Sequence, residues 1–459
     1  MVTHKAWKKN LLIKYLCPRD FRRGEMEEIM KASNYNFFIE HDDDSYLAYN
    51  SRSNSLAIIE KENFRKYSDF VLTGKEIDDS NLVEKLKEGY FLIDDDVDEL
   101  KILRFQMYKD RMSEHTLSLT IAPTSDCNFR CVYCYEKKSI RKKSMTLEVE
   151  DAIIDLIKSV KTTISSMNVA WYGGEPLLRF DVIERLSKRI IQICKENNIQ
   201  YFSSIVTNGY LLTPEIAKKL AEYQIKNIQV TLDGPKETHD KRRILANGEG
   251  SFEKIINNIA MCKEFLPKIN LRINVDKSNF DKVQELYEYF KERNILDIVV
   301  PYLGQVKSSN DCYQENKCLS NNTFSELLYQ FQSFTNRTMF AFYPIRRTNL
   351  CGADSLYSFV IDSDGMLYKC WDDIGIECKS VGNLLEGKTM NMKNVDYITK
   401  DPTLLSKCKE CKFLPICMGG CPFHFGESEN CTYFKYHLEL YLKKVAQERL
   451  FEMNYKKDC

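Results

Sequence analysis

The run Cys127-Asn128-Phe129-Arg130-Cys131-Val132-Tyr133-Cys134 places three cysteines within eight residues. It follows the apolar stretch 117–122, which predicts a short β-strand. Three thiolates on one tight loop can bind three corners of a cubane iron–sulfur cluster, which leaves the fourth iron without a protein ligand. Structural zinc and iron–sulfur sites are normally closed by four ligands. The spacing therefore indicates an iron that is open to chemistry.

The composition limits the class of protein. The chain has 459 residues, of which 43% are hydrophobic and 29% charged, and a globular protein of about two to four domains is expected. Lys plus Arg and Asp plus Glu are equal at 66 each, so we expect neither nucleic acid nor a membrane as a partner. Lys14 interrupts the apolar patch near the N-terminus, which argues against a signal peptide. Seventeen cysteines without an export signal favour metal binding in a reducing cytoplasm.

Strand-like and helix-like runs alternate between about residue 115 and residue 305. Strands are predicted at 117–122, 168–172, 201–206, 228–232, 270–275 and 297–302. Helices are predicted at 147–160, 180–196, 214–223, 251–265 and 280–292, with Thr213 as the N-cap of the third. Such alternation predicts an α/β fold in which a parallel sheet curls into a partial (β/α)6 TIM-like barrel. The active site is then expected at the C-terminal ends of the strands, where the three cysteines lie.

The flanking segments have a different texture. Short strands are predicted at 36–40, 45–49 and 55–60, followed by helices near 62–70 and 81–88. Further helices are predicted at 323–337 and from Tyr433 to about Asn454. We therefore expect an N-terminal unit at 1–110, the barrel at 111–310, a bridging segment at 311–350, a cysteine-rich domain at 351–435 and a C-terminal helix at 436–459.

The cysteine loop resembles the signature of the radical SAM superfamily, CxxxCxxC with an aromatic residue, here Tyr133, before the last cysteine. The resemblance implies that Cys127, Cys131 and Cys134 hold a [4Fe–4S] cluster whose open iron binds S-adenosylmethionine (SAM). In that family one electron cleaves SAM to methionine and a 5′-deoxyadenosyl radical. A zinc or purely structural site is the alternative interpretation.

Further motifs of the same family follow in order. Gly173-Gly174-Glu175-Pro176 resembles the family's GGEP turn, whose backbone groups and carboxylate suit the methionine ammonium group of SAM. Thr207 and Asn208 end the third predicted strand and Thr231 ends the fourth. Arg243 closes a segment that looks like the family's SxDGxxxxHDxxR. The resemblance makes these four residues candidates for contacts with the ribose and carboxylate of SAM. The sequence identifies no general base.

The C-terminal cysteines form a second pattern, which resembles the seven-cysteine SPASM domain of radical SAM enzymes that modify peptides and proteins. The resemblance implies two auxiliary [4Fe–4S] clusters, three clusters in all. Cys351, Cys370 and Cys421 would hold auxiliary cluster I. Auxiliary cluster II would be closed by Cys408, Cys411, Cys417 and Cys431. A fourth ligand for cluster I is not obvious, because Ile345 stands where some relatives have a cysteine. The position stays open between a free iron and another thiol such as Cys378.

The N-terminal unit resembles, in pattern only, the winged-helix-like PqqD-type elements of ribosomal-peptide maturases. Those elements bind the leader of a precursor peptide by adding it as a strand to a sheet edge. The alternative is a structural extension without a partner.

These resemblances predict a radical SAM/SPASM maturase of a ribosomally made peptide, with a small reductase, flavodoxin or ferredoxin as electron donor. The expected product is a thioether between a cysteine sulfur and a carbon, as in sactipeptide and ranthipeptide synthases. A carbon–carbon crosslink is an alternative. Another is an anaerobic sulfatase maturase that forms formylglycine, although those enzymes carry Asp directly after the cysteine matching Cys370, where this chain has Trp371 and then Asp372. A non-catalytic iron–sulfur carrier or peptide-binding scaffold is the third.

Overall fold

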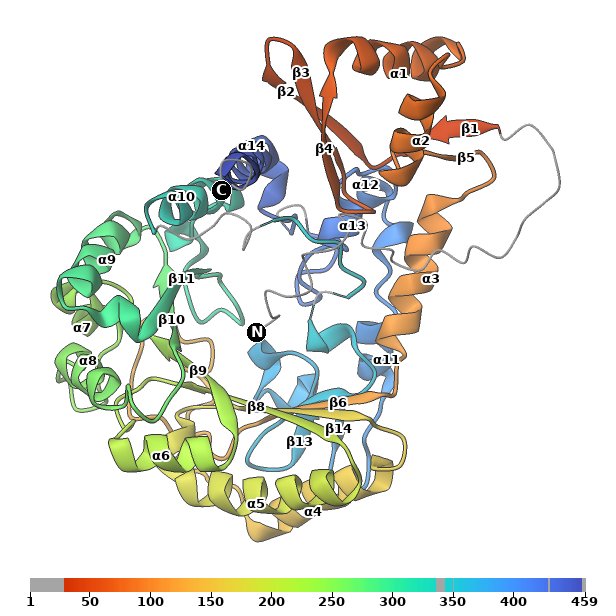
Figure 1. Cartoon of the computed structure of the whole chain (residues 1–459). Helices are drawn as coiled ribbons and strands as arrows, with labels where there is room; N and C mark the ends of the chain where they lie inside the picture. Colours follow the sequence, from red (N-terminus) through yellow and green to blue (C-terminus); the bar gives the residue numbers. More distant parts are fainter. Residues whose placement is uncertain (1–28, 336–342, 350, 428–429, 456–459) are drawn as a thin grey trace.

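The computed structural model describes residues 29–335, 343–349, 351–427 and 430–455. Its centre is a curved sheet in which six parallel strands neighbour one another in chain order (Figure 1). These strands are β6 (Thr116–Ile121), β7 (Ser166–Trp171), β8 (Gln200–Thr207), β9 (Ile225–Thr231), β10 (Ile269–Val275) and β11 (Val299–Gln305). Their bounds lie close to the predicted ones, and the predicted partial (β/α)6 barrel is confirmed.

Helices cover the outer face of this sheet (Figure 1). They are α4 (Leu147–Val160), α5 (Phe180–Glu196), α6 (Pro214–Glu222), α7 (Lys236–Arg242), α8 (Phe252–Met261) and α9 (Val283–Glu292), with the 3-10 turns η1 (Pro176–Arg179), η2 (Phe280–Lys282) and η3 (Ile295–Asp297). Helices α4 and α5 have the predicted bounds, and Thr213 caps α6 by accepting from the Ile216 amide. Helix α7 was not predicted. The core lies between sheet and helices, where Trp171 and Leu186 are fully buried.

A C-terminal hairpin extends the barrel sheet beyond its first strand. Strand β12 (Ser358–Ile361) pairs in parallel with β6, and β13 (Met366–Tyr368) and β14 (Gly382–Asn383) follow in antiparallel order. The cysteine-rich region is therefore joined to the barrel by backbone hydrogen bonds, a feature that the sequence did not predict. Its other short elements are η6 (Gly352–Asp354), η7 (Trp371–Asp373), η8 (Glu377–Lys379), α11 (Met392–Ile398), η9 (Pro402–Leu404), α12 (Ser406–Lys409) and α13 (Leu414–Cys417).

The N-terminal unit contains the three predicted strands as an antiparallel sheet, β2 (Asn36–Asp42), β3 (Ser45–Asn50) and β4 (Ser55–Glu60). Helices α1 (Lys61–Thr73) and α2 (Ser80–Glu88) follow as predicted. The unit also has a small pair, β1 (Met30–Ala32) with β5 (Leu92–Asp94), and a long helix α3 (Glu99–Arg111), none of which was predicted.

The N-terminal unit packs on the C-terminal region (Figure 1). Leu47 and Tyr49 of β3 share a core with α14 (Phe434–Tyr455), the predicted final helix, which α10 (Asn321–Phe334) also contacts. The Tyr49 hydroxyl donates to the Pro344 carbonyl at 2.8 Å. Helix α3 ends at Arg111, which donates to the Ile398 carbonyl and pairs with the buried Asp354 at 3.2 Å. The helix therefore fastens the first unit to the cysteine-rich one.

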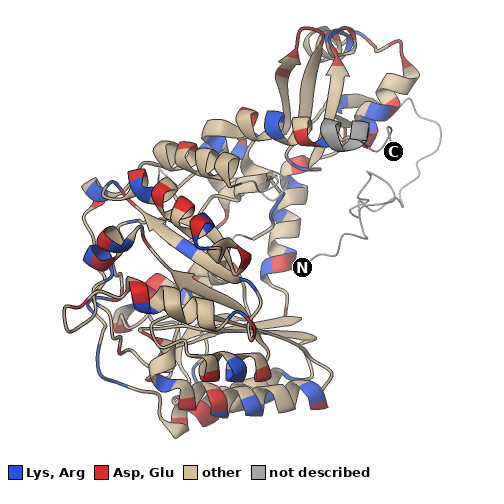
Figure 2. Ribbon diagram, turned by 60° about the vertical axis from the view of Figure 1, so that its left-hand side comes forward, with Lys and Arg blue, Asp and Glu red and all other residues tan. Residues whose placement is uncertain are grey.

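Acidic and basic side chains are interspersed over the helices (Figure 2). Within the part of the chain that the structure describes, no helix is long and apolar enough to cross a membrane. The N-terminal basic segment, Cys17 and Cys459 lie outside the described residues.

Candidate functional site

The cysteine loop leaves the C-terminal end of β6 and is tied down by backbone hydrogen bonds. The Arg130 amide donates to the carbonyl of Ile244, just beyond α7, and the Val132 amide donates to the carbonyl of Arg242, the last residue of α7. Cys127, Cys131 and Cys134 are each partly buried. Burial, with the nearby Glu175 charge, raises the pKa of Cys127 to about 12, and burial also raises the pKa of Cys131 and Cys134.

The three thiols lie close to one another. Negative charge on Cys131 raises the pKa of both Cys127 and Cys134, an effect that requires short distances between them. The Phe129 amide donates to the Cys127 sulfur at 3.4 Å, a contact of the kind that tunes cluster-bound thiolates. Without metal these thiols stay protonated at neutral pH, and iron would hold them as thiolates. The donor set therefore fits a cluster held by three cysteines.

The turn at Gly173 and Gly174 lies against the cysteine loop. A Cβ atom on Gly174 would come within 2.1 Å of the Asp126 carbonyl oxygen, and Gly173 has a φ of +100°. The Glu175 amide donates to that same Asp126 carbonyl at 2.9 Å. The two glycines are thus required by a close approach of two backbones, which fixes the cysteine loop against β7.

The Glu175 side chain is an internal tie between strand ends. It is fully buried, and its carboxylate accepts from the Thr207 hydroxyl at 2.6 Å, the Asn208 amide at 2.8 Å and the Leu177 amide at 3.1 Å. Burial raises the pKa of Glu175, while these hydrogen bonds act in the opposite direction. The Thr207 hydroxyl therefore uses its proton in the hydrogen bond to Glu175. The Asn208 side chain donates to the side chain of Asn128, which follows Cys127.

Arg243 approaches the cysteine loop from the other side. Its guanidinium donates to the Tyr133 hydroxyl at 2.9 Å, and it lies 5.6 Å from the Phe129 ring. Its charge lowers the pKa of Cys131 against the larger effect of burial. Thr231, at the end of β9, is buried. The aromatic residue of the signature thus joins the loop to Arg243 and, through Asn274, to β10.

A buried ion-pair group behind this site was not predicted. Arg242 pairs with Asp276 at 2.8 Å and with Asp233 at 3.3 Å. His239 accepts from the Asp233 amide through Nδ1. These residues fix the ends of β9 and β10, and the HDxxR pattern was the signal that could have identified them.

The seven C-terminal cysteines separate into two groups. Charge on Cys421 raises the pKa of both Cys351 and Cys370, and burial raises that of Cys351 to about 11. In the second group, Cys408 and Cys417 are each affected by Cys411 and Cys431. The ligand sets of the two auxiliary clusters stay a prediction from the sequence. Cys378 is exposed in η8, and no interaction links its thiol to the first group among the described residues.

The first group borders the mouth of the barrel. Trp371 follows Cys370, and its ring centroid lies 4.2 Å from that of Tyr172, just after β7. Its indole N–H donates to the Thr120 hydroxyl of β6. Asp372 accepts from Ser309 at 2.6 Å. Burial and the Asp372 charge raise the pKa of the buried Glu136 to about 7. Glu136 lies near Cys134 of the cysteine loop and Asp372 lies near Cys370, and no sequence motif marks Glu136.

In the described residues no three His, Cys, Asp or Glu side chains meet at the spacing of a single metal ion. Cys194 and Cys262 are buried in the barrel core.

Comparison with known proteins identifies this arrangement. Residues 121–301 match the Radical SAM superfamily. The chain carries a radical SAM domain. That domain implies a [4Fe–4S] cluster and SAM, and the predicted enzyme class is confirmed at the level of the superfamily.

The radical SAM domain has relatives that are similar over most of their length. A cysteine-type anaerobic sulfatase-maturating enzyme of Clostridium novyi is 28% identical over 72% of this chain and 96% of its own. The same enzyme of Clostridium perfringens is 27% identical over 66% and 88%. The radical SAM cyclopropyl synthase TigE of Paramaledivibacter caminithermalis is 25% identical over 58% and 61%.

Two solved structures share the fold. Native anSMEcpe with bound AdoMet and Cp18Cys peptide is 24% identical, with a TM-score of 0.58, over 74% of this chain and 99% of that chain. Streptococcus suis SuiB bound to S-adenosylmethionine is 16% identical, with a TM-score of 0.52, over 87% and 99%.

Proposed function

We propose that the chain is a maturase of a ribosomally made precursor peptide and that it links a cysteine sulfur to a carbon of that peptide. The observation that carries the proposal is the group Cys351, Cys370 and Cys421 beside the barrel mouth. A cluster held by three cysteines offers one iron for a substrate thiolate, and a bound metal lowers the pKa of such a thiol.

The residues divide into roles accordingly. Cys127, Cys131 and Cys134 hold the cluster that, with SAM, supplies the 5′-deoxyadenosyl radical when both are bound. Cys408, Cys411, Cys417 and Cys431 hold auxiliary cluster II. Glu175 and Thr207 position the SAM site through their mutual hydrogen bond, and the Gly173–Gly174 backbone, Asn208, Thr231 and Arg243 are left to contact SAM.

The chemistry balances without a further oxidant. The radical takes one hydrogen atom from the substrate carbon, the cysteine thiol loses its proton and the new S–C bond forms. The surplus electron needs an acceptor, which the auxiliary clusters supply when bound. The product is lighter by two hydrogens per link and keeps its sulfur.

The N-terminal sheet supports a peptide substrate. Strands β2 and β4 are its two edges, and edge strands offer backbone groups for strand addition. We assign the unit at 1–110 to leader recognition, and a small reductase, flavodoxin or ferredoxin to electron supply. A domain at 351–435 with two clusters completes the proposed architecture.

A second candidate is formylglycine formation on a sulfatase. The relatives named as sulfatase-maturating enzymes favour it, as does the half-buried Asp372 carboxylate at the mouth. Trp371 argues against it, because its ring occupies the position directly after Cys370 and packs on Tyr172.

The test is anaerobic incubation of the reconstituted enzyme with SAM, a reductant and the short peptide encoded beside it, followed by mass spectrometry. We expect 5′-deoxyadenosine, loss of two hydrogens per link and fewer free thiols. Loss of sulfur would identify formylglycine instead. Formation of 5′-deoxyadenosine with an unchanged peptide would contradict the proposal, and absence of 5′-deoxyadenosine would favour the non-catalytic alternatives.

A further inference from the structure

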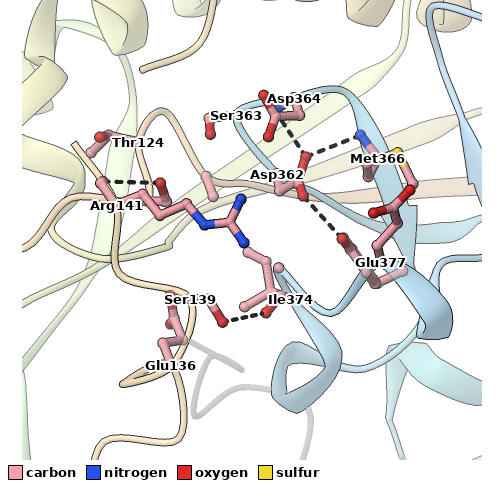
Figure 3. A pocket seen from close by; sticks show the side chains of 14 residues that line it. Thr124, Glu136, Ser139, Arg141, Asp362, Ser363, Asp364, Met366, Ile374 and Glu377 are labelled. Carbon is pink, nitrogen blue, oxygen red and sulfur yellow. Dashed lines mark hydrogen bonds between the residues drawn. The ribbon is translucent and has the colours of Figure 1, made fainter. Parts of the chain in front are cut away.

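A cavity of about 260 Å³ lies between the outgoing arm of the cysteine loop and the C-terminal hairpin (Figure 3). Three segments line it, namely the residues just after β6, the arm at 136–141 and the segment 362–377. The arm and the hairpin segment are held together, because Ser139 donates to the Ile374 carbonyl and a Cβ on Gly375 would meet the Ser139 hydroxyl. The walls are therefore preformed.

Glu136 faces this cavity without a partner. Its backbone carbonyl is fixed by the amides of Ser139 and Ile140, and the residue as a whole is only 8% exposed. Among the described residues, no hydrogen bond or ion pair reaches its carboxylate, which lines the cavity. A buried carboxylate with no partner is costly, and such groups are normally paired or hydrogen-bonded. The side chain therefore lacks a counterpart that a ligand could provide.

The other charged side chains around the cavity leave Glu136 dominant inside it. Asp362 is satisfied by the Tyr368 hydroxyl and by the amides of Asp364 and Met366. Asp364 pairs with Lys143. Glu377 and Arg141 are exposed lining residues of opposite charge, and the Arg141 side chain extends toward Ile374 (Figure 3). The exposed charges are thus balanced, while the interior holds two buried carboxylates, Asp362 and Glu136, of which only Glu136 lacks a hydrogen-bond partner among the described residues.

We propose that this cavity binds the cationic side chain of a lysine or arginine of the peptide substrate, with its charged end on Glu136. The proposal rests on a peptide being the substrate. Ala122, Met366 and Ile374 provide an apolar wall for the aliphatic stem, and the carboxylate provides the charged partner for its head. The volume is below the roughly 300–1,000 Å³ of pockets that take whole drug-sized ligands, and it suits one side chain.

The position of Glu136 makes the cavity a determinant of substrate choice. Glu136 lies two residues after Cys134, on the arm that the Ser139 hydroxyl ties to the Ile374 carbonyl. A basic residue held there would fix the position of the neighbouring substrate residues relative to the cysteine loop at 127–134 and to the group Cys351, Cys370 and Cys421. Glu136 is thus a specificity residue that contacts substrate at a distance from the reacting atoms.

The test uses n-butylguanidinium and n-butylammonium as probes, titrated calorimetrically into the anaerobically reconstituted full chain, with butyrate as the anionic comparison. We expect at least one cation to bind and butyrate not to bind. Glu136→Gln, which keeps the shape of the side chain, should weaken cation binding at least tenfold. Arg141→Gln, which removes a repelling charge at the rim, should leave it unchanged or tighten it, and Glu377→Gln should change it less than threefold.

Iron content and circular dichroism of each variant check that the fold is kept. Lack of cation binding by the wild type, equal binding by Glu136→Gln, or butyrate binding that depends on Arg141 would each overturn the proposal. The titration needs neither peptide nor turnover. Failure of the crosslinking assay alone therefore leaves this result standing, and failure of the titration leaves the proposed reaction untouched.

Discussion

The two cysteine regions of this chain hold their thiols in different ways. Cys127, Cys131 and Cys134 lie on one loop at the end of a buried strand, and neighbouring backbone carbonyls fix that loop. The C-terminal cysteines come from residues 351–431, on short turns and one-turn helices. Bringing cysteines together from distant positions costs the chain entropy of closing long loops. A short loop that leaves an ordered barrel strand avoids most of that cost. The first site is thus preformed by the barrel, while the second is held by short turns and by the units packed around it.

The largest expected difference between the two regions is catalytic. Cys131→Ala should lower 5′-deoxyadenosine formation by at least about a thousandfold, because the cluster that binds SAM loses a ligand, which corresponds to about 4 kcal/mol. Cys421→Ala should change it less than about tenfold while abolishing the peptide product. The measurements are chromatography of 5′-deoxyadenosine and mass spectrometry of the peptide.

Iron analysis provides the control for these variants. Cys131→Ala should lose about four irons per chain, one cubane cluster, and keep the rest. If Cys421→Ala abolished SAM cleavage with the first cluster intact by spectroscopy, the separation of the two regions would be wrong.

The second prediction tests how the first site is preformed. Gly174→Ala forces a Cβ atom to within 2.1 Å of the Asp126 carbonyl, so the cysteine loop must move. We expect SAM affinity to fall by about 2–3 kcal/mol, or roughly thirty- to 150-fold, in line with costs of overpacking a rigid site. Equilibrium dialysis with SAM measures this.

Gly387→Ala is the matched comparison for that variant, because no atom lies within 4 Å of the position where its Cβ would be built. Its φ of +65° brings backbone strain without a collision, and it should leave SAM binding unchanged. Equal loss of SAM affinity in both variants would show that the backbone approach at Gly174 is not what matters.

The third prediction concerns the support of the second site. Arg111 and Asp354 form a buried pair, and Asp354 lies close enough to Cys351 to affect its pKa. Arg111→Ala leaves a buried carboxylate without its main partner, which typically costs about 3–5 kcal/mol. We expect a lower urea midpoint and loss of auxiliary iron, with SAM binding retained.

The exposed pair Lys101–Asp98 on the same helix is the control. Lys101→Ala should cost less than about 1 kcal/mol, as is usual for surface ion pairs. If Arg111→Ala lost iron from both regions equally, helix α3 would support the whole molecule rather than the second site.

The sequence predicted the barrel well because its signals are local. The six strands of residues 116–305 and every helix longer than one or two turns follow short-range patterns, with the short helix α7 as the exception. The cap at Thr213 lies where the pattern placed it. The cysteine loop was visible for the same reason. Helix α3 was missed because its buried face holds little beyond Leu103 and Met107, although Asp98 is an N-cap that could have marked its start.

The long-range parts could not be read from the sequence. The contact of Glu175 with the methionine ammonium group stays a prediction, but its hydrogen bond from Thr207, 32 residues away, is one that only the fold brings about. The pairing of β12 with β6 joins segments more than 200 residues apart. Glu136 became a candidate only when its cavity, formed by three distant segments, was visible. Contacts between residues this far apart in the sequence produce no hydrophobic periodicity or short motif from which they could be predicted.

The smallest predicted effect is a pH dependence of the free energy of unfolding that arises from His239 in the barrel. His239 is buried, and its ring is bonded to the Asp233 amide and to Ser251. Burial, with the charges of Arg243 and Arg242, holds its pKa well below the usual value. The unfolded chain therefore binds a proton here below about pH 6.5 while the folded chain does not, and stability falls as the pH falls by at most about 1.4 kcal/mol per unit.

Urea unfolding at pH 7.5 and 5.5 measures this dependence in the wild type and in His239→Gln, which cannot take up the proton. We expect the variant to be less stable at pH 7.5 but to lose less stability between the two pH values. His239 lies in the barrel helix α7, far in sequence from the C-terminal cysteines. The difference in acid-induced loss of stability should therefore be seen with a spectroscopic signal from the barrel. Equal losses in the two proteins would mean that another group controls the acid sensitivity of the first site.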